Sequence, residues 1–120
     1  MTCYLDDDLD QDLLIQLAGS RSHRLISPRS LGRSGDQDAL HFLCAVSQGL
    51  PILTRNAKDF AALHEFGLGI GGHHLGLLVV YEEADRRKNM RINDIVNALT
   101  NLEAANVPLG DQLIALNHYR

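Results

Sequence analysis

The stretch GDQDALHFLCAVSQGLPILTRNAKDF, residues 35–60, decides the fold because it places a helix, a tight turn and a buried strand in close succession. Asp36 can cap the helix, since its carboxylate can accept a hydrogen bond from an unpaired backbone N–H of the first turn. Gly49 ends the helix because glycine tolerates the left-handed conformation found there. The apolar run Pro51–Thr54 then predicts a strand buried on both faces. The mostly apolar helical face has the spacing i, i+3, i+4, i+7 and consists of Leu40, Leu43, Cys44 and Ser47.

Two of the predicted strands end in acidic or polar side chains. The first strand, Thr2–Leu5, is followed directly by Asp6, Asp7 and Asp8. In an open parallel sheet, ligands bind outside the carboxyl ends of the strands. We therefore expect both strand ends to contribute to one acidic site. The polar residues that follow the strand at residues 51–54 are Arg55, Asn56, Lys58 and Asp59.

Helical and strand patterns alternate through the rest of the chain. Further strands are expected at Arg24–Ser27 and Leu77–Tyr81, and further helices at Leu9–Ala18, Phe60–Phe66 and Asn93–Ala105. This alternation predicts an α/β fold of three layers, with a mainly parallel central sheet between helices.

Local signals add detail to these elements. The helix at residues 9–18 is expected to end at Gly19 and to bury Leu13, Leu14 and Leu17. Five glycines in ten residues predict a flexible loop at Gly67–Gly76. The tail Gln112–Tyr119 fits a strand or a helix equally well.

Length and composition predict one domain, residues 1–120. A chain of 120 residues with 45% hydrophobic residues is long and apolar enough to bury a core. No apolar run approaches the roughly 20 residues that span a bilayer, so we expect no membrane segment. The start MTCYLDDD lacks the basic region and apolar core of a secretion signal. Because Cys3 and Cys44 are isolated, we expect reduced core cysteines and a cytoplasmic protein.

The acids can bind a divalent cation. Carboxylates at one edge of a sheet, with water in the other coordination positions, suit Mg²⁺ or Mn²⁺, which prefer oxygen ligands. Such an ion would also relieve the repulsion between the carboxylates. The candidate ligands are Asp6, Asp38 and Asp59, and Asn56 can supply a neutral oxygen or hold a water.

Each acid also has a purely structural interpretation. Asp6–Asp8 can be a solvated turn, or Asp8 can cap the first helix, and Asp36 fits a helix cap better than a metal ligand. Asp38 can simply favour the dipole of its helix, and Asp59 can cap a short helix beginning at Phe60. The pair His73-His74 lacks a second pair at zinc-site spacing and is better explained as part of a glycine-rich surface loop.

Basic residues are clustered although the formal net charge is -4. That charge argues against binding nucleic acid by bulk charge alone. The cluster fits a solvated loop or a phosphate-binding segment, and spacing does not decide between them. The candidate substrate-binding residues are Arg21, Arg24, Arg29 and Arg33, together with Arg55 and Lys58.

Three segments resemble one known family. The segment DALHFLCAVSQGLPILTRNAKDF, residues 38–60, is similar to the central helix and following strand of PIN-domain nucleases, which include toxins of toxin–antitoxin modules. The start YLDDDL resembles their first acidic motif. The region Gly76–Arg120, with its closing LNHYR, resembles a short PIN-like branch of the same superfamily. The resemblance covers nearly the whole chain.

The resemblance implies a PIN-like fold and a Mg²⁺- or Mn²⁺-dependent ribonuclease site. By position, Asp6 matches the first acid, Asp38 the acid that opens the central helix, and Asn56 and Asp59 the polar pair after Thr-Arg. Longer PIN domains carry a further acid on an extra helix before the central one. The candidates for it here are Asp36 and Asp38. Secondary site residues are Asp7, Asp36, Asn56 and Thr54.

The leading hypothesis is an endoribonuclease for single-stranded RNA, acting as the toxin partner of a small antitoxin protein. The alternative is a catalytically degenerate PIN-like module that binds RNA or protein. A phosphatase or another phosphoryl-transfer enzyme is a weaker third reading, because no nucleophile motif accompanies the acids. A homodimer is expected, because the helix at residues 93–105 and the tail would leave apolar surface exposed.

Overall fold

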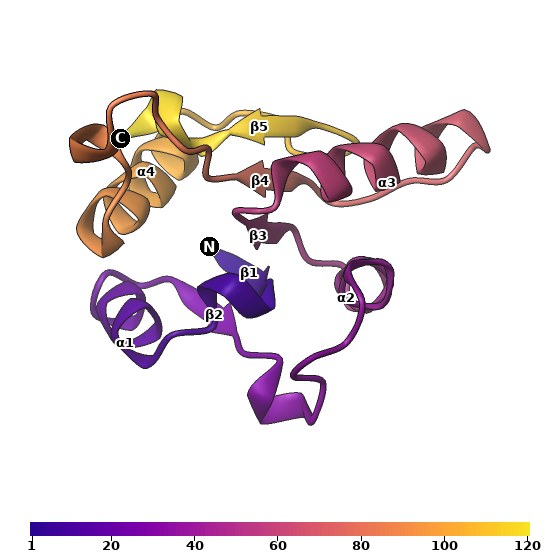
Figure 1. Cartoon of the computed structure of the whole chain (residues 1–120), viewed down its shortest axis with the longest axis horizontal. Helices are drawn as coiled ribbons and strands as arrows, with labels where there is room; N and C mark the ends of the chain where they lie inside the picture. The colour runs from indigo at the N-terminus through magenta and orange to yellow at the C-terminus, as the bar shows by residue number, and fades with distance from the viewer.

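Five parallel strands form the single sheet of the computed structural model, which describes residues 1–120 (Figure 1). Their spatial order is β2-β1-β3-β4-β5, and every neighbouring pair is parallel. Helices cover both faces, so the predicted three-layer α/β fold is confirmed. The strands are β1 (Thr2–Leu5), β2 (Arg24–Ile26), β3 (Ile52–Thr54), β4 (Leu77–Val79) and β5 (Leu113–Ala115).

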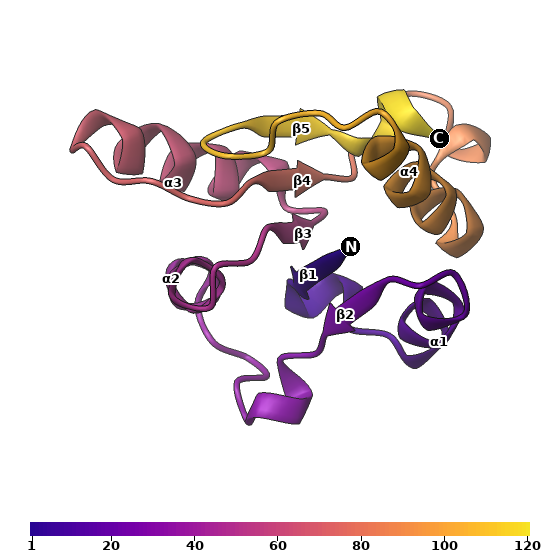
Figure 2. The same ribbon diagram turned by 180° about the vertical axis from the view of Figure 1, so that it is seen from behind.

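The four α-helices divide evenly between the two faces of the sheet. In Figures 1 and 2, α1 and α4 lie together on one side and α2 and α3 on the other. None of them is long and apolar enough to cross a bilayer. The helices are α1 (Asp12–Ser20), α2 (Asp38–Ser47), α3 (Ala57–Gly69) and α4 (Ile92–Ala104), with short 3₁₀ turns η1 (Asp7–Leu9), η2 (Arg29–Leu31), η3 (Arg86–Lys88) and η4 (Leu116–Tyr119).

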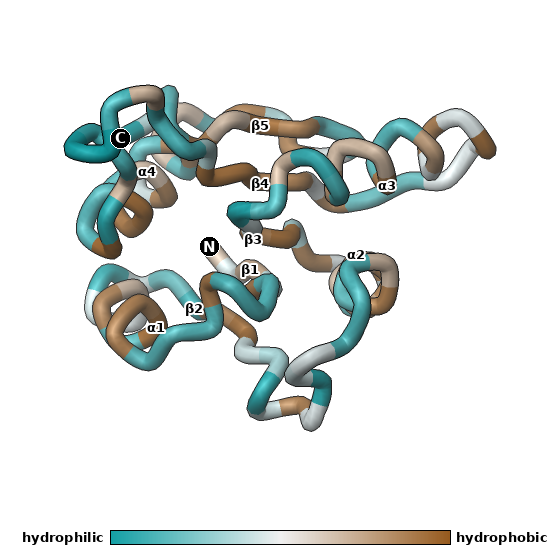
Figure 3. The backbone as a smooth tube through the Cα atoms, viewed as in Figure 1, coloured by the Kyte–Doolittle hydropathy of each residue, from teal (hydrophilic) through white to brown (hydrophobic).

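Alternation along the strands divides the core in two. Cys3 and Leu5 of β1 face α1 and α4, in a cluster of 16 buried residues, whereas Tyr4 faces α2 and α3, in a cluster of 7. The central strands are correspondingly hydrophobic along their length (Figure 3). Because side chains alternate, Asp6 points to the same face as Tyr4, toward α2 and α3.

The helix of the last crossover, α4, lies on the face of the sheet opposite α2 and α3. From β2 the chain moves in one direction across the sheet to β3, β4 and β5. The helices α2 and α3 of the first two steps share one face, whereas α4 packs with α1 on the other. The β4–α4–β5 crossover therefore has the opposite hand to those two, an exception among parallel sheets. This arrangement leaves the core beneath α2 and α3 the smaller one.

Several predicted boundaries are wrong. Helix α1 starts later than expected and includes Gly19, and α3 continues to Gly69, through residues assigned to a short helix and a loop. Asp36 does not cap α2; Gln37 occupies the N-cap position, and Asp36 accepts from Arg33 instead. Asp59 lies inside the first turn of α3 rather than at a cap. The tail is both a strand, β5, and a 3₁₀ turn, η4.

Two buried faces also differ from the predictions. On α2 the buried residues are His41, Cys44 and Ala45, while Leu40 and Leu43 are exposed; on α1, Leu13 is exposed. The apolar face of α4 is buried against the sheet and α1, so it supplies no dimer surface. Exposed large hydrophobic side chains instead gather on α2, α3 and the segment after α3: Leu40, Leu43, Phe66, Leu68, Ile70 and Leu75.

Gly76 supplies a backbone conformation, directly before β4, that a residue with a Cβ would adopt only with strain. Its φ is +125°, and an added Cβ would lie 3.1 Å from Leu109 Cβ and 3.2 Å from the Leu109 carbonyl oxygen. Overpacking and an unfavourable backbone conformation should together lower the free energy of unfolding of Gly76→Ala by about 2 kcal/mol. Urea unfolding measures this. The control Gly110→Ala has nothing within 4 Å of the new Cβ and should match wild type; equal losses in both variants would contradict the prediction.

Candidate functional site

The carboxyl ends of β1 and β3, with the acids that gather there, form what we call the acidic edge. It lies where the strand order reverses. The chain leaves β1 toward β2 on one side and later returns to β3 on the other, and a crevice at such a point is the usual ligand site of an open α/β sheet. Leu5 pairs with Leu53 in the register of β1 and β3, so Asp6 and Thr54 end the two strands side by side. The Thr54 Oγ1 donates to Asp6 Oδ2 at 2.8 Å.

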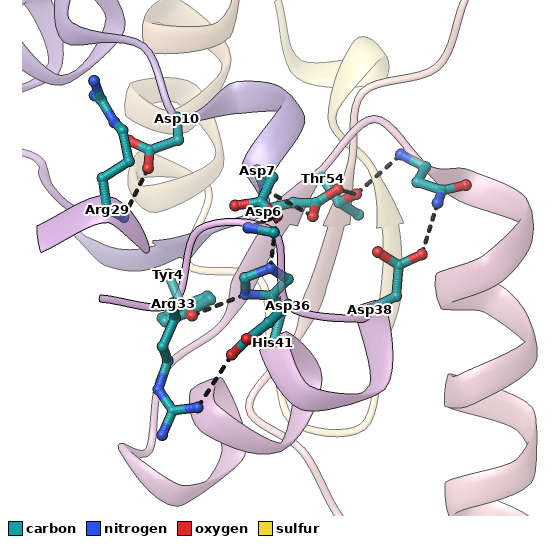
Figure 4. Close-up of polar contacts among 12 residues, drawn as sticks. Tyr4, Asp6, Asp7, Asp10, Arg29, Arg33, Asp36, Asp38, His41 and Thr54 are labelled. Carbon is teal, nitrogen blue, oxygen red and sulfur yellow. Dashed lines mark hydrogen bonds and ion pairs between the residues drawn. The ribbon is translucent and has the colours of Figure 1, made fainter. Parts of the chain in front are cut away.

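Asn56 extends this contact to two more carboxylates. Its backbone N–H donates to Thr54 Oγ1 at 2.9 Å, and its Nδ2 donates to Asp38 Oδ2 at 2.7 Å and to Asp59 Oδ2 at 3.0 Å. Asp38 and Asp59 each stand in the first turn of a helix, where the helix dipole favours an acid. The structure therefore brings Asp6, Asp38 and Asp59 to one edge from three separate segments. Figure 4 shows Asp6 beside Thr54, with Asp38 near them.

Burial and mutual repulsion perturb two of these carboxyls. Burial raises the pKa of Asp6, while hydrogen bonds from Thr54 and from the Asp7 N–H oppose the rise. Burial also raises the pKa of Asp38, and the charges of Asp6 and Asp59 raise it further. Asp38 therefore lies in an environment that favours a proton or a cation nearby.

The donor atoms at this edge suit a hard divalent cation. Three carboxylates and one amide supply only oxygen ligands, and Mg²⁺ commonly uses one or two carboxylates with water completing its shell. As the side chains stand, no group of three His, Cys, Asp or Glu residues is arranged to hold a metal ion. The Asn56 amide N–H group occupies the position between Asp38 and Asp59 instead. The donor oxygens of Asp38 and Asp59 suit such an ion chemically, but only with the Asn56 N–H group moved from between them.

His41 is a site residue that sequence patterns missed. Its ring is fully buried on α2, with Nδ1 3.0 Å from Tyr4 Oη and Nε2 2.9 Å from Asp7 Oδ2. Figure 4 shows the three side chains in line beside the acidic edge. Both partners lie more than 30 residues away in the chain, so no local spacing could have indicated them. The Asp7 carboxylate thus joins the site through His41, while the Asp7 N–H donates directly to Asp6.

Most of the predicted substrate-binding arginines are not at this edge or are paired with acids. Arg29 pairs with Asp10 and Asp12, and Arg33 pairs with Asp36. Arg21 donates to Asn97 on α4. Arg24 begins β2 and so lies at the amino ends of the strands, whereas Asp6 lies at their carboxyl ends.

An open groove of about 720 Å³ adjoins the acidic edge at Asn56. Arg55 and Lys58 line it, both exposed, and Tyr81 lines it as well. Arg55 also donates to the carbonyl oxygen of Met90, another residue of the groove lining, at 3.4 Å. These two cations are the predicted substrate-binding residues that the structure places beside the acids.

The His73-His74 pair is only partly a surface feature. His73 is exposed and lies 2.9 Å from Asp111, as expected of a loop. His74 is buried, however, with Nε2 2.7 Å from His64 Nδ1 and Nδ1 accepting from the Gly76 N–H. With both ring nitrogens in use, His74 serves as a structural link between α3 and the start of β4.

Comparisons with known proteins leave the family open. No protein-family model matches the chain, and no curated protein or solved structure matches it either.

The raised pKa of Asp38 predicts how stability depends on pH. Between its ordinary pKa of 3.8 and the raised value, the folded state binds more protons than the unfolded state, so stability falls as pH rises through that window. Asp38→Asn removes the ionisation. We expect this variant to unfold at higher urea concentration than wild type at neutral pH, and to lose the advantage below about pH 4.

Asp10→Asn is the control with the opposite sign. Burial alone would raise the pKa of Asp10, but hydrogen bonds from Arg29 and Ser27 lower it overall. Its stabilisation is present at neutral pH and is lost on acidification, so Asp10→Asn should unfold more easily than wild type at neutral pH. If both variants shift the urea midpoint in the same direction, the electrostatic description of Asp38 is wrong.

Proposed function

We propose that this protein is a metal-dependent endoribonuclease that cuts single-stranded RNA. The observation that carries the proposal is the convergence of Asp6, Asp38 and Asp59, linked through Thr54 and Asn56, at the carboxyl edge of two adjacent parallel strands. The sequence resemblance to PIN-domain nucleases assigns the same three acids independently. Ribonuclease chemistry is the activity for which both arguments select the same residues.

Asp38 and Asp59 are the residues that would hold Mg²⁺ or Mn²⁺, with Asp6 as the third carboxylate. A half-turn of the Asn56 amide replaces its N–H group by its oxygen at the position between them, which adds a neutral ligand. When bound, such an ion orients a water for attack on a phosphodiester and offsets charge on the phosphoryl oxygens.

The remaining side chains support that arrangement and the substrate. Thr54 and the Asp7 N–H hold the two oxygens of Asp6 in place. Arg55 and Lys58 face an open groove beside the acids and can bind backbone phosphates. The exposed ring of Tyr81 on the same groove offers a surface on which an unpaired base can stack. An unpaired strand fits these contacts better than a duplex, whose bases are not free to stack.

The biological setting follows from the resemblance alone. It is that of a cytoplasmic toxin held inactive by a small antitoxin protein, acting as a homodimer. The exposed apolar residues on α2 and α3 are the surface that either partner protein would cover.

A second candidate function is a noncatalytic PIN-like module that binds RNA or protein. It is favoured by two observations. An amide N–H group, rather than a ligand oxygen, occupies the position between Asp38 and Asp59, and no three His, Cys, Asp or Glu side chains are arranged to hold a metal ion. Such a module would retain the acidic edge as a hydrogen-bonded structural feature.

Asp6→Asn distinguishes the two candidates. The variant removes one charge with little change of shape and should lower Mn²⁺-dependent cleavage of single-stranded RNA by about a hundredfold or more. Its unfolding temperature should be unchanged or slightly raised, since relief of carboxylate repulsion offsets the one hydrogen bond that the amide nitrogen cannot accept. Cleavage of an end-labelled RNA, with and without EDTA, provides the measurement.

The control is Asp85→Asn, at the acid that caps η3, pairs with Arg87 and does not line the groove. It should cleave as wild type does. RNA binding by wild type without any cleavage in Mg²⁺ or Mn²⁺ would establish the noncatalytic module. If Asp6→Asn lost activity and also unfolded at a clearly lower temperature than wild type, Asp6 would be a structural residue.

A further inference from the structure

His41 connects the two segments that carry Asp6 and Asp38. Its partners Tyr4 and Asp7 flank Asp6 in the chain, and both contacts come from the ring of one residue. His41 follows Asp38 by three positions on α2, so the two side chains lie on the same side of the helix, about one turn apart. A ring fixed at both nitrogens thus fixes the first turn of α2 relative to the end of β1.

The apolar contacts of α2 leave this alignment undetermined, whereas the Asn56 amide holds Asp38 from the segment that follows β3. The helix packs mainly against α3, through the small cluster that contains Cys44, Ala45 and Phe60. That packing is apolar and non-directional, so it does not by itself determine where Asp38 stands relative to Asp6. The hydrogen bonds of His41 are directional and buried, and leaving either partner unsatisfied would be costly.

Asp7 depends strongly on His41. Its Oδ2 accepts from the Gly35 N–H at 3.0 Å and lies 2.9 Å from His41 Nε2, while its Oδ1 is buried without any partner. A carboxylate with one unsatisfied oxygen is held by the contacts of the other oxygen.

We propose that His41 is a positioning residue which, held between Tyr4 and Asp7, keeps Asp38 opposite Asp6 and so sets the affinity of the acidic edge for a divalent cation. The proposal rests on the metal site of the proposed function and adds a residue to which that function assigns no role. Substitutions at His41 should therefore change the affinity for the ion although His41 is not itself a metal ligand.

The test is Mn²⁺ binding by isothermal titration calorimetry to the full chain. His41→Phe keeps a planar ring but removes both hydrogen bonds, and should weaken the Mn²⁺ Kd about tenfold, as loss of a residue supporting metal ligands commonly does. His41→Gln can place an amide N–H where Nε2 lies and should stay within about threefold of wild type. His41→Asn reaches only the Nδ1 position and should resemble His41→Phe.

Controls separate positioning from general destabilisation. Ile95 lies in the core on the other face of the sheet. The variant Ile95→Val should therefore unfold at a lower temperature without a change in its Kd for Mn²⁺. Tyr4→Phe removes only the hydroxyl that contacts the ring, and serves as the second variant should His41→Phe fail to fold; it should also weaken Mn²⁺ binding.

Wild-type Mn²⁺ affinity in folded His41→Phe, or in Tyr4→Phe, would overturn the proposal. Mn²⁺ binding by wild type together with weaker binding by His41→Phe would support the positioning role. If the wild type then cut no RNA, only the nuclease proposal would fail. Absence of Mn²⁺ binding by wild type overturns both the metal site and the role of His41.

Discussion

The hydroxyl of Thr54 is the contact on which the acidic edge depends. It donates to Asp6 and accepts from the backbone of Asn56, whose amide in turn holds Asp38 and Asp59. Thr54 is fully buried and is placed by the register of β1 and β3. The sheet therefore determines the position of the first acid, and the two helices that follow Gln37 and Asn56 bring the other two to it.

The charge of this edge explains the donors that surround it. Three carboxylates brought to one edge repel one another, and burial adds to the cost of ionising Asp6 and Asp38. The protein offsets part of that cost with the hydroxyl of Thr54, the amide of Asn56 and the ring of His41. A divalent cation at the same place would offset more of it, which is the physical basis for expecting one. The smaller core beneath α2 and α3 makes the directional contacts of His41 the more important for holding the edge together.

Local signals predicted the fold class and the place of Asp6 at the carboxyl ends of the strands, whereas spacing alone left open whether Asp38 and Asp59 would converge with it. Strand-like and helical periodicity determine the alternation of elements, and an acid directly after a strand lies at the carboxyl edge in any parallel sheet. What spacing could not predict depends on contacts between distant residues. Leu40 and Leu43 fit one helical face, yet the crossovers bury the neighbouring face that contains His41. Pairing of Arg29 and Arg33 with acids likewise required the fold.

A crystal soaked in Mn²⁺ tests the central claim most directly. Anomalous difference density at the manganese edge should show a peak between Asp38 and Asp59, within coordination distance of both, with the Asn56 oxygen turned toward it. Absence of any peak there, with the Asn56 N–H group still donating to both carboxylates, would contradict the account and leave the acidic edge as a hydrogen-bonded structural feature.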